Sequence, residues 1–456
     1  MLDQSIFRSY DVRGEFGSEL TEEAAYIIAH AYAEFTGAKR VVVGMDVRTS
    51  SPVLMGAVVR GLLERGCDVI DIGMVSTDVS YFSAWKYAFD GSIMVTASHM
   101  PKQFNGLKFL YVNAEGILVP IGKGLGMEQL RDLANRPDIV RDVKKQGTLT
   151  GKDVWDDYVA FVRSFVDIGA IKPLHVVMDA GNGMGGLVAE KVFSGLPLVR
   201  ADMNFEPDGR FPHHSPNPIV PKNRADIIAK VKEVGADLGI AWDADCDRCY
   251  FIDEKGTFIN GDFITALLGK YFVQRNPGAS IVYDAVSNRG VRHAVEAAGG
   301  IAYMERVGHV YIKHKMREIH AVFGGETSGH YYFAENHHMD NGFIPALIVM
   351  QMMSVTDKSL SALIGELGEY HVSGEINYIV EDVDAIYARL KESFSDGKVT
   401  TIDGLSIDYP EWHFNVRPSA TDPVIRLNVE ATSPTMVRDK VALVSEIIGA
   451  DQVEDD

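Results

Sequence analysis

The sequence predicts three similar α/β domains with mixed sheets and a smaller C-terminal α+β domain, arranged around a central cleft. Short apolar strands alternate with amphipathic helices in three successive stretches, the pattern of sheets covered on both faces. Beyond Gly374 the pattern changes, and strands outnumber helices. The 456 residues give room for three or four domains of ordinary size.

The first two domains are expected over residues 1–148 and 149–255, because the same alternation occurs twice there. The elements predicted for the first domain are helices 22–35 and 53–64 and strands 40–45, 68–72 and 92–95. Those predicted for the second are helices 154–166 and 225–234 and strand 175–179, followed by an acidic loop. Each domain therefore ends its pattern in a polar loop.

The third and fourth domains are expected over residues 256–367 and 368–456. The elements predicted for the third are helices 262–274 and 291–298 and strand 281–284. Those predicted for the fourth are strands 375–380 and 424–429, helices 383–394 and 435–448, and two further β runs. Each domain should contribute one loop to the shared cleft, with a hinge near Gly374 that lets the fourth domain close and exclude water.

The first of these loops presents a serine. Ser98 follows a short apolar strand, and Ala97 and Pro101 favour a tight turn that holds its side chain outward and exposed. A serine hydroxyl is a weak nucleophile unless neighbours activate it, or it carries a stable charged group such as phosphate. The alternative is an ordinary turn, in which Ser, His99 and Pro are common.

The second loop is acidic. In an extended segment Asp243, Asp245 and Asp247 would project to the same side and converge. A hard cation such as Mg2+ removes their repulsion, and Arg248 beside it could hold phosphate oxygens. The same spacing fits a calcium loop of EF-hand type, but Arg248 stands where that loop needs glycine, and the flanks read as strands. A merely solvated acidic loop is the other alternative.

The third and fourth loops suit a sugar and a phosphate. Residues 324–330 combine glycines with a carboxylate, hydroxyls and an imidazole, a set that can bond vicinal sugar hydroxyls. Residues 417–423 offer a guanidinium, two hydroxyls and a turn, which suit a phosphate. Taken singly, either loop could be a surface loop without function.

In this order, the four loops and the opening segment 6–14 resemble the α-D-phosphohexomutase superfamily, in its phosphomannomutase and phosphoglucomutase branch. The resemblance spans nearly the whole chain. It implies an isomerase that interconverts hexose 6-phosphate and hexose 1-phosphate, with mannose preferred and glucose, or both sugars, as the alternative. It also implies a phosphoserine, a hexose 1,6-bisphosphate as intermediate and activator, and one Mg2+ per chain.

The resemblance also assigns roles to individual residues. Ser98 would carry the phosphate and, with Asp243, Asp245 and Asp247, ligate Mg2+. Lys108 would be the general acid and base, polarised by Arg13, and Arg248 would add charge, with His99 a lesser candidate for a chemical role. The expected substrate-binding residues are Tyr10, His309, Glu326, Ser328, Arg417, Ser419, Thr421 and Arg426.

Some positions depart from the usual pattern of the family. Met100, Ala244, Cys246 and Ala420 replace the usual residues of three loops and are interpreted as tolerated variants. Val286 stands where bacterial enzymes that accept both sugars tend to have a basic residue, so the sugar preference stays open.

Composition limits the possible partners. The formal net charge of −19 argues against nucleic acid and anionic membranes, so the expected partner is a small sugar phosphate. The three cysteines imply no disulfide framework and, together with the absence of a basic and apolar leader, predict a cytoplasmic protein. The longest apolar stretch, 343–353, is too short to span a bilayer. Whether the chain is a monomer or a dimer is left open.

Two other enzyme classes compete. Residues 181–186 form a glycine-rich loop between a strand and a helix, with Asp202 about twenty residues on, as in nicotinamide-dependent oxidoreductases. That class would leave the serine, acidic and arginine loops without roles. A phosphomonoesterase would use the same serine and metal but transfer the phosphate to water.

Overall fold

The computed structural model describes residues 2–140, 145–418, 424–450 and 452–453. The chain forms two compact units. Unit 1 comprises Met1–Asn260 and Ser328–Leu363, and unit 2 comprises Gly261–Thr327 and Ile364–Asp456. These units group the residues differently from four consecutive domains, and the boundaries at 148, 255 and 367 stay a prediction.

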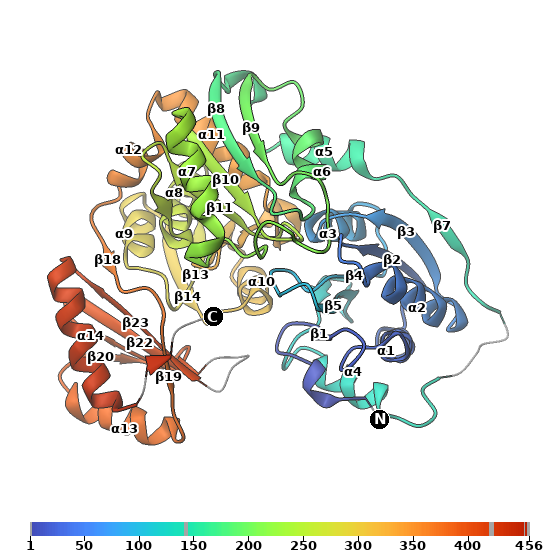
Figure 1. Ribbon diagram of the computed structural model, residues 1–456. Coiled ribbons are helices and arrows are strands. Elements are labelled where there is room, and N and C mark those ends of the chain that lie inside the picture. The colour runs from blue at the N-terminus through green and yellow to red at the C-terminus, as the bar shows by residue number, and fades with distance from the viewer. Residues whose placement is uncertain (1, 141–144, 419–423, 451, 454–456) are drawn as a thin grey trace. The chain divides into compact units, whose positions relative to one another are not determined.

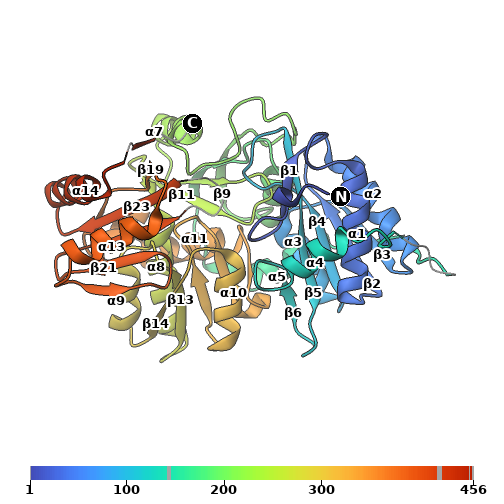
Figure 2. The ribbon, with the colours of Figure 1, turned by 90° about the horizontal axis from the view of Figure 1, so that it is seen from below.

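The first sheet of unit 1 has the strand order β1-β5-β4-β2-β3-β7, with β6 paired to β5 (Figures 1 and 2). The pairs β2/β3, β2/β4 and β3/β7 are parallel, whereas β4/β5, β1/β5 and β5/β6 are antiparallel, so the sheet is mixed as predicted. The strands are β1 (Val12–Glu15), β2 (Arg40–Met45), β3 (Asp68–Met74), β4 (Gly91–Val95), β5 (Phe104–Val112), β6 (Leu118–Pro120) and β7 (Leu149–Gly151).

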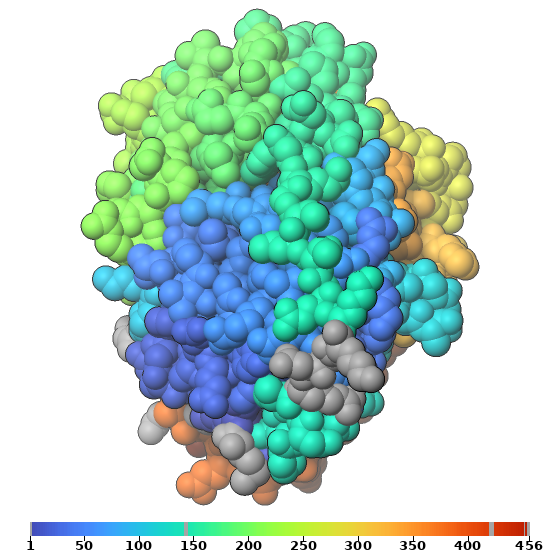
Figure 3. All heavy atoms as spheres, turned by 90° about the vertical axis from the view of Figure 1, so that its right-hand side faces the viewer, coloured from blue at the N-terminus to red at the C-terminus, as the bar shows by residue number. Residues whose placement is uncertain are grey.

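Four helices accompany this sheet: α1 (Glu22–Thr36), α2 (Ser51–Glu64), α3 (Thr77–Lys86) and α4 (Met127–Ala134). Buried side chains of α1, α2 and α4 form one hydrophobic core with β2 and β4, and α3 contacts the same two strands. The short strand β7 is exposed, and the segment that contains it runs over the face shown in Figure 3.

The second sheet of unit 1 has the order β12-β11-β10-β8-β9. Its strands are β8 (Leu174–Asp179), β9 (Leu198–Met203), β10 (Leu238–Trp242), β11 (Cys249–Asp253) and β12 (Phe258–Ile259), and its helices are α5 (Trp155–Arg163), α6 (Gly185–Val192) and α7 (Ala225–Val234). The strand β10 is parallel to β8 and antiparallel to β11, so the connection between β10 and β11 is a tight hairpin loop. Unit 1 also contains the antiparallel pair β16 (Tyr331–Phe333) and β17 (Met339–Asp340), with helices α11 (Ile344–Thr356) and α12 (Leu360–Gly365).

Unit 2 begins with a parallel array in the order β14-β13-β15. The elements are β13 (Ser280–Asp284), β14 (Ile301–Glu305) and β15 (Phe323–Gly325), with helices α8 (Gly261–Arg275), α9 (Gly290–Ala297) and α10 (His309–Glu318). Parallel strands joined through helices account for the continuous burial of β13 and β15.

The second part of unit 2 is an antiparallel sheet in the order β20-β21-β22-β23-β19-β24, with β18 paired to β23. Its strands are β18 (His371–Val372), β19 (Ile376–Ile379), β20 (Lys398–Thr400), β21 (Leu405–Asp408), β22 (Trp412–Pro418), β23 (Val424–Ala431) and β24 (Gln452–Val453). Helices α13 (Val383–Ser393) and α14 (Pro434–Ile448) pack on it around one core. The predicted change from α/β to α+β is confirmed.

Short 3-10 helices complete the described secondary structure: η1 (Gln4–Ile6), η2 (Ile168–Ala170), η3 (Pro221–Arg224) and η4 (Ala334–Asn336). Among the described residues, no helix combines the length and the apolar composition that a membrane crossing requires.

Candidate active site

Ser98 lies just beyond the end of β4, in the loop that leads to β5. Its backbone is left-handed, with φ of 51°, a conformation that costs a residue with a side chain roughly 1–2 kcal/mol. The residue is only 1% exposed, so the expectation of an outward, exposed hydroxyl is wrong. It is buried because its hydroxyl faces the acidic loop of the second sheet, donating to Asp243 with 2.8 Å between Oγ and Oδ2.

The three aspartates of that loop converge as predicted, although the reason given for it is wrong. Carboxylate oxygens of Asp243, Asp245 and Asp247 all lie within 4.8 Å of one another, and the three residues are buried. The segment is a turn rather than an extended strand, and Cys246 within it has a φ of 59°. Convergence therefore comes from a turn that reverses the chain between β10 and β11, which also excludes the helix-flanked calcium loop.

The charge balance of this cluster suits a bound cation. Burial and the neighbouring carboxylates of Asp247 and Asp245 raise the pKa of Asp243 well above its usual value. Oδ1 of Asp245 is buried and has no hydrogen-bond partner among the described residues. A hard divalent cation with oxygen ligands would remove the repulsion and use the orphaned oxygen, so these residues fit Mg2+.

Lys108 lies against the same cluster, as predicted. Its Nζ is 2.7 Å from Oδ2 of Asp245 and 2.5 Å from Oδ2 of Asp247. Burial disfavours its charge, but the two carboxylates outweigh burial and raise the pKa of Lys108 well above its usual value. Thr77, at the start of α3, also donates its hydroxyl to Oδ2 of Asp245 at 2.5 Å, a contact that the sequence did not suggest.

Two glycines let neighbouring segments approach this turn. A Cβ at Gly183 would lie 2.6 Å from the carbonyl oxygen of Ala244, and one at Gly342 would lie 2.4 Å from that of Cys246. The amide of Met184 donates to the same Ala244 carbonyl at 2.8 Å. The glycine-rich loop therefore supports the acidic turn.

The same loop cannot cradle a pyrophosphate with these amides, because protein groups already accept from them. The amides of residues 181–184 donate to Asp179, Asn204, Ala180 and Ala244 in turn. His213 and His214 brace the same loop, with contacts to Asn182 at 2.8 Å and to Asp179 at 3.0 Å. The oxidoreductase alternative loses its main argument.

His330, which the sequence placed only among the sugar-binding groups of the glycine-rich loop, belongs to this cluster. His330 is 6% exposed, and its Nε2 lies 3.3 Å from Nε of Arg248 and 3.5 Å from Oδ1 of Asp247. Its Nδ1 lies 2.9 Å from Oγ of Ser328. Arg248 in turn lies 3.7 Å from Asp243. The only signal in the sequence is its place at the end of a glycine-rich loop, 82 residues from Arg248.

His99, Arg13 and Tyr10 are half-buried. Nδ1 of His99 lies 3.2 Å from Oγ of Ser98, so this lesser candidate for a chemical role lies next to the serine hydroxyl. Burial and the charges of Arg248 and Arg13 lower the pKa of His99 well below its usual value, which keeps its ring neutral. Arg13 pairs with Asp11 at 2.7 Å, and Tyr10 lies in the bend before β1.

Unit 2 holds the predicted sugar-binding carboxylate. Glu326 is 1% exposed and accepts from the amide of Gly308 at 3.0 Å. The next residue, Thr327, is fixed by Asp284, whose pKa burial and the charge of Glu326 raise to about 7. His309 begins α10, and its Nδ1 lies 3.3 Å from Nζ of Lys313.

The predicted phosphate-binding arginines lie on neighbouring strands. Arg417 on β22 and Arg426 on β23 face each other in register, and both pair with Glu375 at 2.9 Å. Arg417 is 7% exposed, so it is not a solvated surface residue. Ser419 and Thr421, with Ala420, lie outside the described residues.

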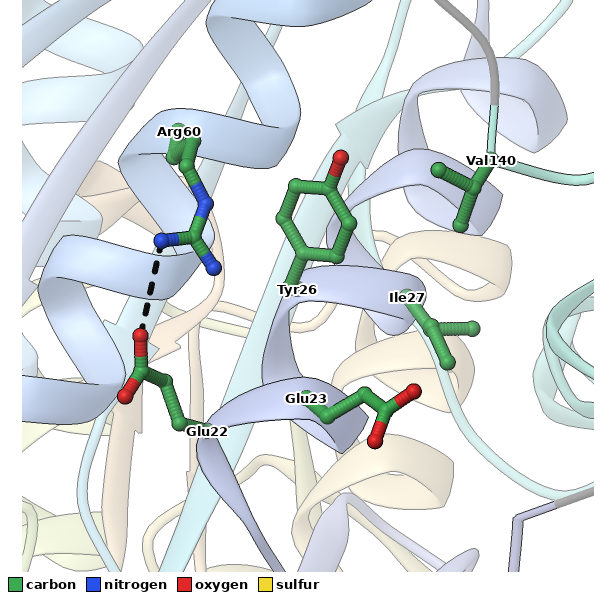
Figure 4. A pocket seen from close by; sticks show the side chains of 6 residues that line it. All are labelled: Glu22, Glu23, Tyr26, Ile27, Arg60 and Val140. Carbon is green, nitrogen blue, oxygen red and sulfur yellow. Dashed lines mark hydrogen bonds and ion pairs between the residues drawn. The ribbon is translucent and has the colours of Figure 1, made fainter.

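The hollow shown in Figure 4 is separate from these groups. Six residues of α1, α2 and the segment after α4 line it, among them Arg60 and Glu22, which form an ion pair at 3.4 Å. No residue named above lines it. The candidate groups are therefore the buried polar cluster around Ser98 within unit 1 and, described separately, the groups around Glu326 and Arg417 within unit 2.

Comparison with known proteins agrees with this geometry. The chain matches four domain families of phosphoglucomutase/phosphomannomutase, namely the alpha/beta/alpha domains I (4–122), II (156–256) and III (260–370) and the C-terminal domain (375–446). It is 38% identical over 447 residues to a phosphomannomutase of Escherichia coli, covering 95% of this chain and 97% of the relative. It is 39% identical over 429 residues to a protein of Xanthomonas campestris pv. campestris named phosphohexose mutases, covering 93% and 94%.

A solved structure shows the same architecture. A phosphoglucomutase/phosphomannomutase family protein from Burkholderia thailandensis superposes with a TM-score of 0.87 at 33% identity, covering 99% of this chain and all of the other. The fold, the buried serine beside three carboxylates and these full-length relatives agree. The chain belongs to the phosphoglucomutase/phosphomannomutase family and is a phosphohexomutase, an isomerase.

Proposed function

We propose that this protein interconverts mannose 6-phosphate and mannose 1-phosphate through a phosphoserine at Ser98 and a hexose 1,6-bisphosphate. The observation that carries the proposal is the burial of Ser98 against the acidic turn, with Oγ 2.8 Å from Asp243. A phosphate on this hydroxyl would lie beside a cation-binding cluster, where its charge is balanced. The same hydroxyl, once free, could accept phosphate from either end of the bisphosphate.

Asp243, Asp245 and Asp247 would hold Mg2+, with an oxygen of the serine phosphate as a further ligand. Bound there, Mg2+ supplies electrostatic stabilisation of the transferred phosphoryl oxygens. Arg248 adds donors next to Asp243, and His330 holds the Arg248 side chain at 3.3 Å. In phosphoryl transfer most of the rate gain comes from such positioning and charge stabilisation.

A proton must leave the sugar hydroxyl as it attacks the phosphoserine and return in the second transfer. Lys108 is the proposed acid and base, because its amine lies in the cluster next to Asp245 and Asp247, and Mg2+ bound to these carboxylates would offset the charge that raises the pKa of Lys108. Arg13 polarises it. The neutral ring of His99, 3.2 Å from Oγ of Ser98, orients the serine hydroxyl before it is phosphorylated.

Substrate recognition is assigned to groups of both units. Glu326 and Ser328 bond sugar hydroxyls, and His309 and Tyr10 contact the substrate. Arg417 and Arg426, with Ser419 and Thr421, bind the phosphate that is not transferred. Glu375 holds both guanidinium groups at 2.9 Å, where a phosphate would accept the same donors.

The preference for mannose rests on the names of the relatives, which are phosphomannomutases. A coupled assay with mannose 1-phosphate and glucose 1-phosphate side by side, with bisphosphate added, tests class and sugar together. The expected result is 6-phosphate formation, faster from the mannose compound. Faster turnover of the glucose compound would reverse the sugar assignment, and release of inorganic phosphate without isomer would show a phosphomonoesterase instead.

A further inference from the structure

Both peptide groups of Ser98 are tied to one buried carboxylate, Asp46. On one side, the amide of Ser98 donates to Oγ1 of Thr96 at 2.9 Å, and that hydroxyl donates to Oδ2 of Asp46 at 2.8 Å. On the other side, the carbonyl of Ser98 accepts from Nη2 of Arg48 at 2.5 Å, and Nε of Arg48 donates to the same Asp46 oxygen at 3.1 Å. Asp46 and Thr96 are fully buried, and Arg48 is 1% exposed.

Arg48 directs four of its five N–H donors to backbone carbonyls of residues 98–104, and the fifth to Asp46. Besides Asp46 and Ser98, its guanidinium donates to the carbonyls of Met100, Pro101 and Phe104 at 2.7, 2.9 and 3.0 Å. These contacts use all five N–H donors of an arginine, in a planar fork that a lysine cannot reproduce. The connection between β9 and η3 covers the group, since the guanidinium carbon lies 5.2 Å from the centroid of the Phe211 ring.

This arrangement matters because Ser98 is held in a left-handed backbone conformation. Such a conformation persists only where neighbouring contacts hold it in place. Here hydrogen bonds fix the peptide groups on both sides of Ser98. The direction of the Ser98 side chain toward Asp243 depends on that backbone. Among the described residues, no hydrogen bond or ion pair joins Thr96 or Arg48 to the three aspartates, although the charge of Arg48 is felt by Asp245, so their hydrogen bonds reach the site through Ser98.

We propose that Asp46, Thr96 and Arg48 are positioning residues that set Ser98 for phosphoryl transfer. This rests on the proposed role of Ser98 as the phosphoserine. The three side chains hold the serine at the distance from the acidic turn that transfer requires, without touching the substrate. Loosening them should slow transfer more than it weakens substrate binding, because misplacement by about 1 Å can cost on the order of 100-fold in rate.

The first test compares two variants at one position, each of which removes one feature of the threonine side chain. Thr96→Val removes the hydroxyl, and Thr96→Ser keeps it. We expect Thr96→Val to lower kcat about 10-fold with KM within about twofold of the parent, and Thr96→Ser to restore most of the loss. Arg48→Lys should lower kcat at least as much. Arg60→Lys is the control. Arg60 is half exposed, and its ion pair is with Glu22, away from Ser98.

A second readout does not depend on the reaction. Hydrogen exchange of the Ser98 amide should be faster in Thr96→Val than in the parent and in Thr96→Ser, because the amide loses its acceptor. Unchanged exchange in Thr96→Val, or a rise in KM that matches the fall in kcat, would overturn the proposal. The parent protein could also show slow exchange of the Ser98 amide but neither isomerise hexose phosphates nor become phosphorylated. That outcome would refute the proposed function and leave the positioning contacts supported.

Discussion

The hydroxyl of Ser98 donates to Asp243, with 2.8 Å between Oγ and Oδ2, across 145 residues of sequence. The bond joins the end of β4 in one sheet to the turn between β10 and β11 in another. The proposed nucleophile and the proposed cation-binding cluster are thus one buried polar group within unit 1. The reactivity of each should depend on the other.

Ser98→Ala should abolish isomerisation, because no other described hydroxyl bonds Asp243. Intact-protein mass spectrometry should find one phosphate on the parent and none on the variant. Since the hydroxyl is buried and hydrogen-bonded, we also expect a stability loss of about 1–2 kcal/mol in urea denaturation. Ser83→Ala, a buried serine of α3 that bonds Val79, is the control and should keep its activity. Equal phosphorylation of Ser98→Ala and parent would contradict the assignment.

Asp245→Asn should lower the rate by about 100-fold or more, since it removes a charged ligand from a dry site, a loss of ~3 kcal/mol. The concentration of Mg2+ needed for half-maximal activity should rise in parallel, and a chelator should abolish parental activity. Asp156→Asn, on the exposed face of α5, provides the matched control. Full activity of the parent in excess chelator would exclude the metal site.

Arg417→Ala should raise KM for hexose monophosphates about 10-fold or more, because a charge-assisted hydrogen bond to phosphate is worth about 1.5–3 kcal/mol. Phosphorylation of Ser98 by the bisphosphate should still occur, since the transfer groups are intact. Arg438→Ala, on the exposed face of α14, should leave KM unchanged. A parental KM in Arg417→Ala would remove this arginine from the binding site.

Gly183→Ala should destabilise unit 1 by about 1–3 kcal/mol, because its Cβ would lie 2.6 and 2.7 Å from backbone atoms of Ala244. Gly56→Ala offers a control of opposite sign. That glycine lies in helix α2 with open space around it, so alanine there should add about 0.5–1 kcal/mol. Urea denaturation of the three proteins measures both effects. An unchanged midpoint for Gly183→Ala would mean that the acidic turn yields to the new methyl group.

The sequence predicted regular elements best where apolar periodicity and end signals agree. Strand β2 and helix α7 have the predicted bounds, and α7 ends at Gly235 in a left-handed conformation. Strand β5 was not predicted, because Asn105 and Lys108 interrupt its apolar run. Both are buried in the structure, where Asn105 bonds Ser50 and Ser51 and Lys108 bonds two aspartates.

The same limit applies to the candidate site. The residue types of the four loops identified Ser98 and the three aspartates, and resemblance added Lys108. Their burial could not be read from the sequence, because it arises from contacts between segments more than a hundred residues apart. Thr77 and Arg48 escaped notice because each is an ordinary residue in its own segment, and the place of His330 beside Arg248 could not be read from its loop.

Two cysteines in and next to the turn that carries the aspartates can report on its opening. The chain has three cysteines, all buried, and two of them, Cys246 and Cys249, flank Asp247 and Arg248. Burial raises the pKa of both thiols, so they react only when the turn opens. With Cys67 replaced by serine, the rate of thiol labelling measures how often the turn opens. A ligand that binds the carboxylates should lower the labelling rate. Its affinity can then be measured from that rate without any turnover of substrate.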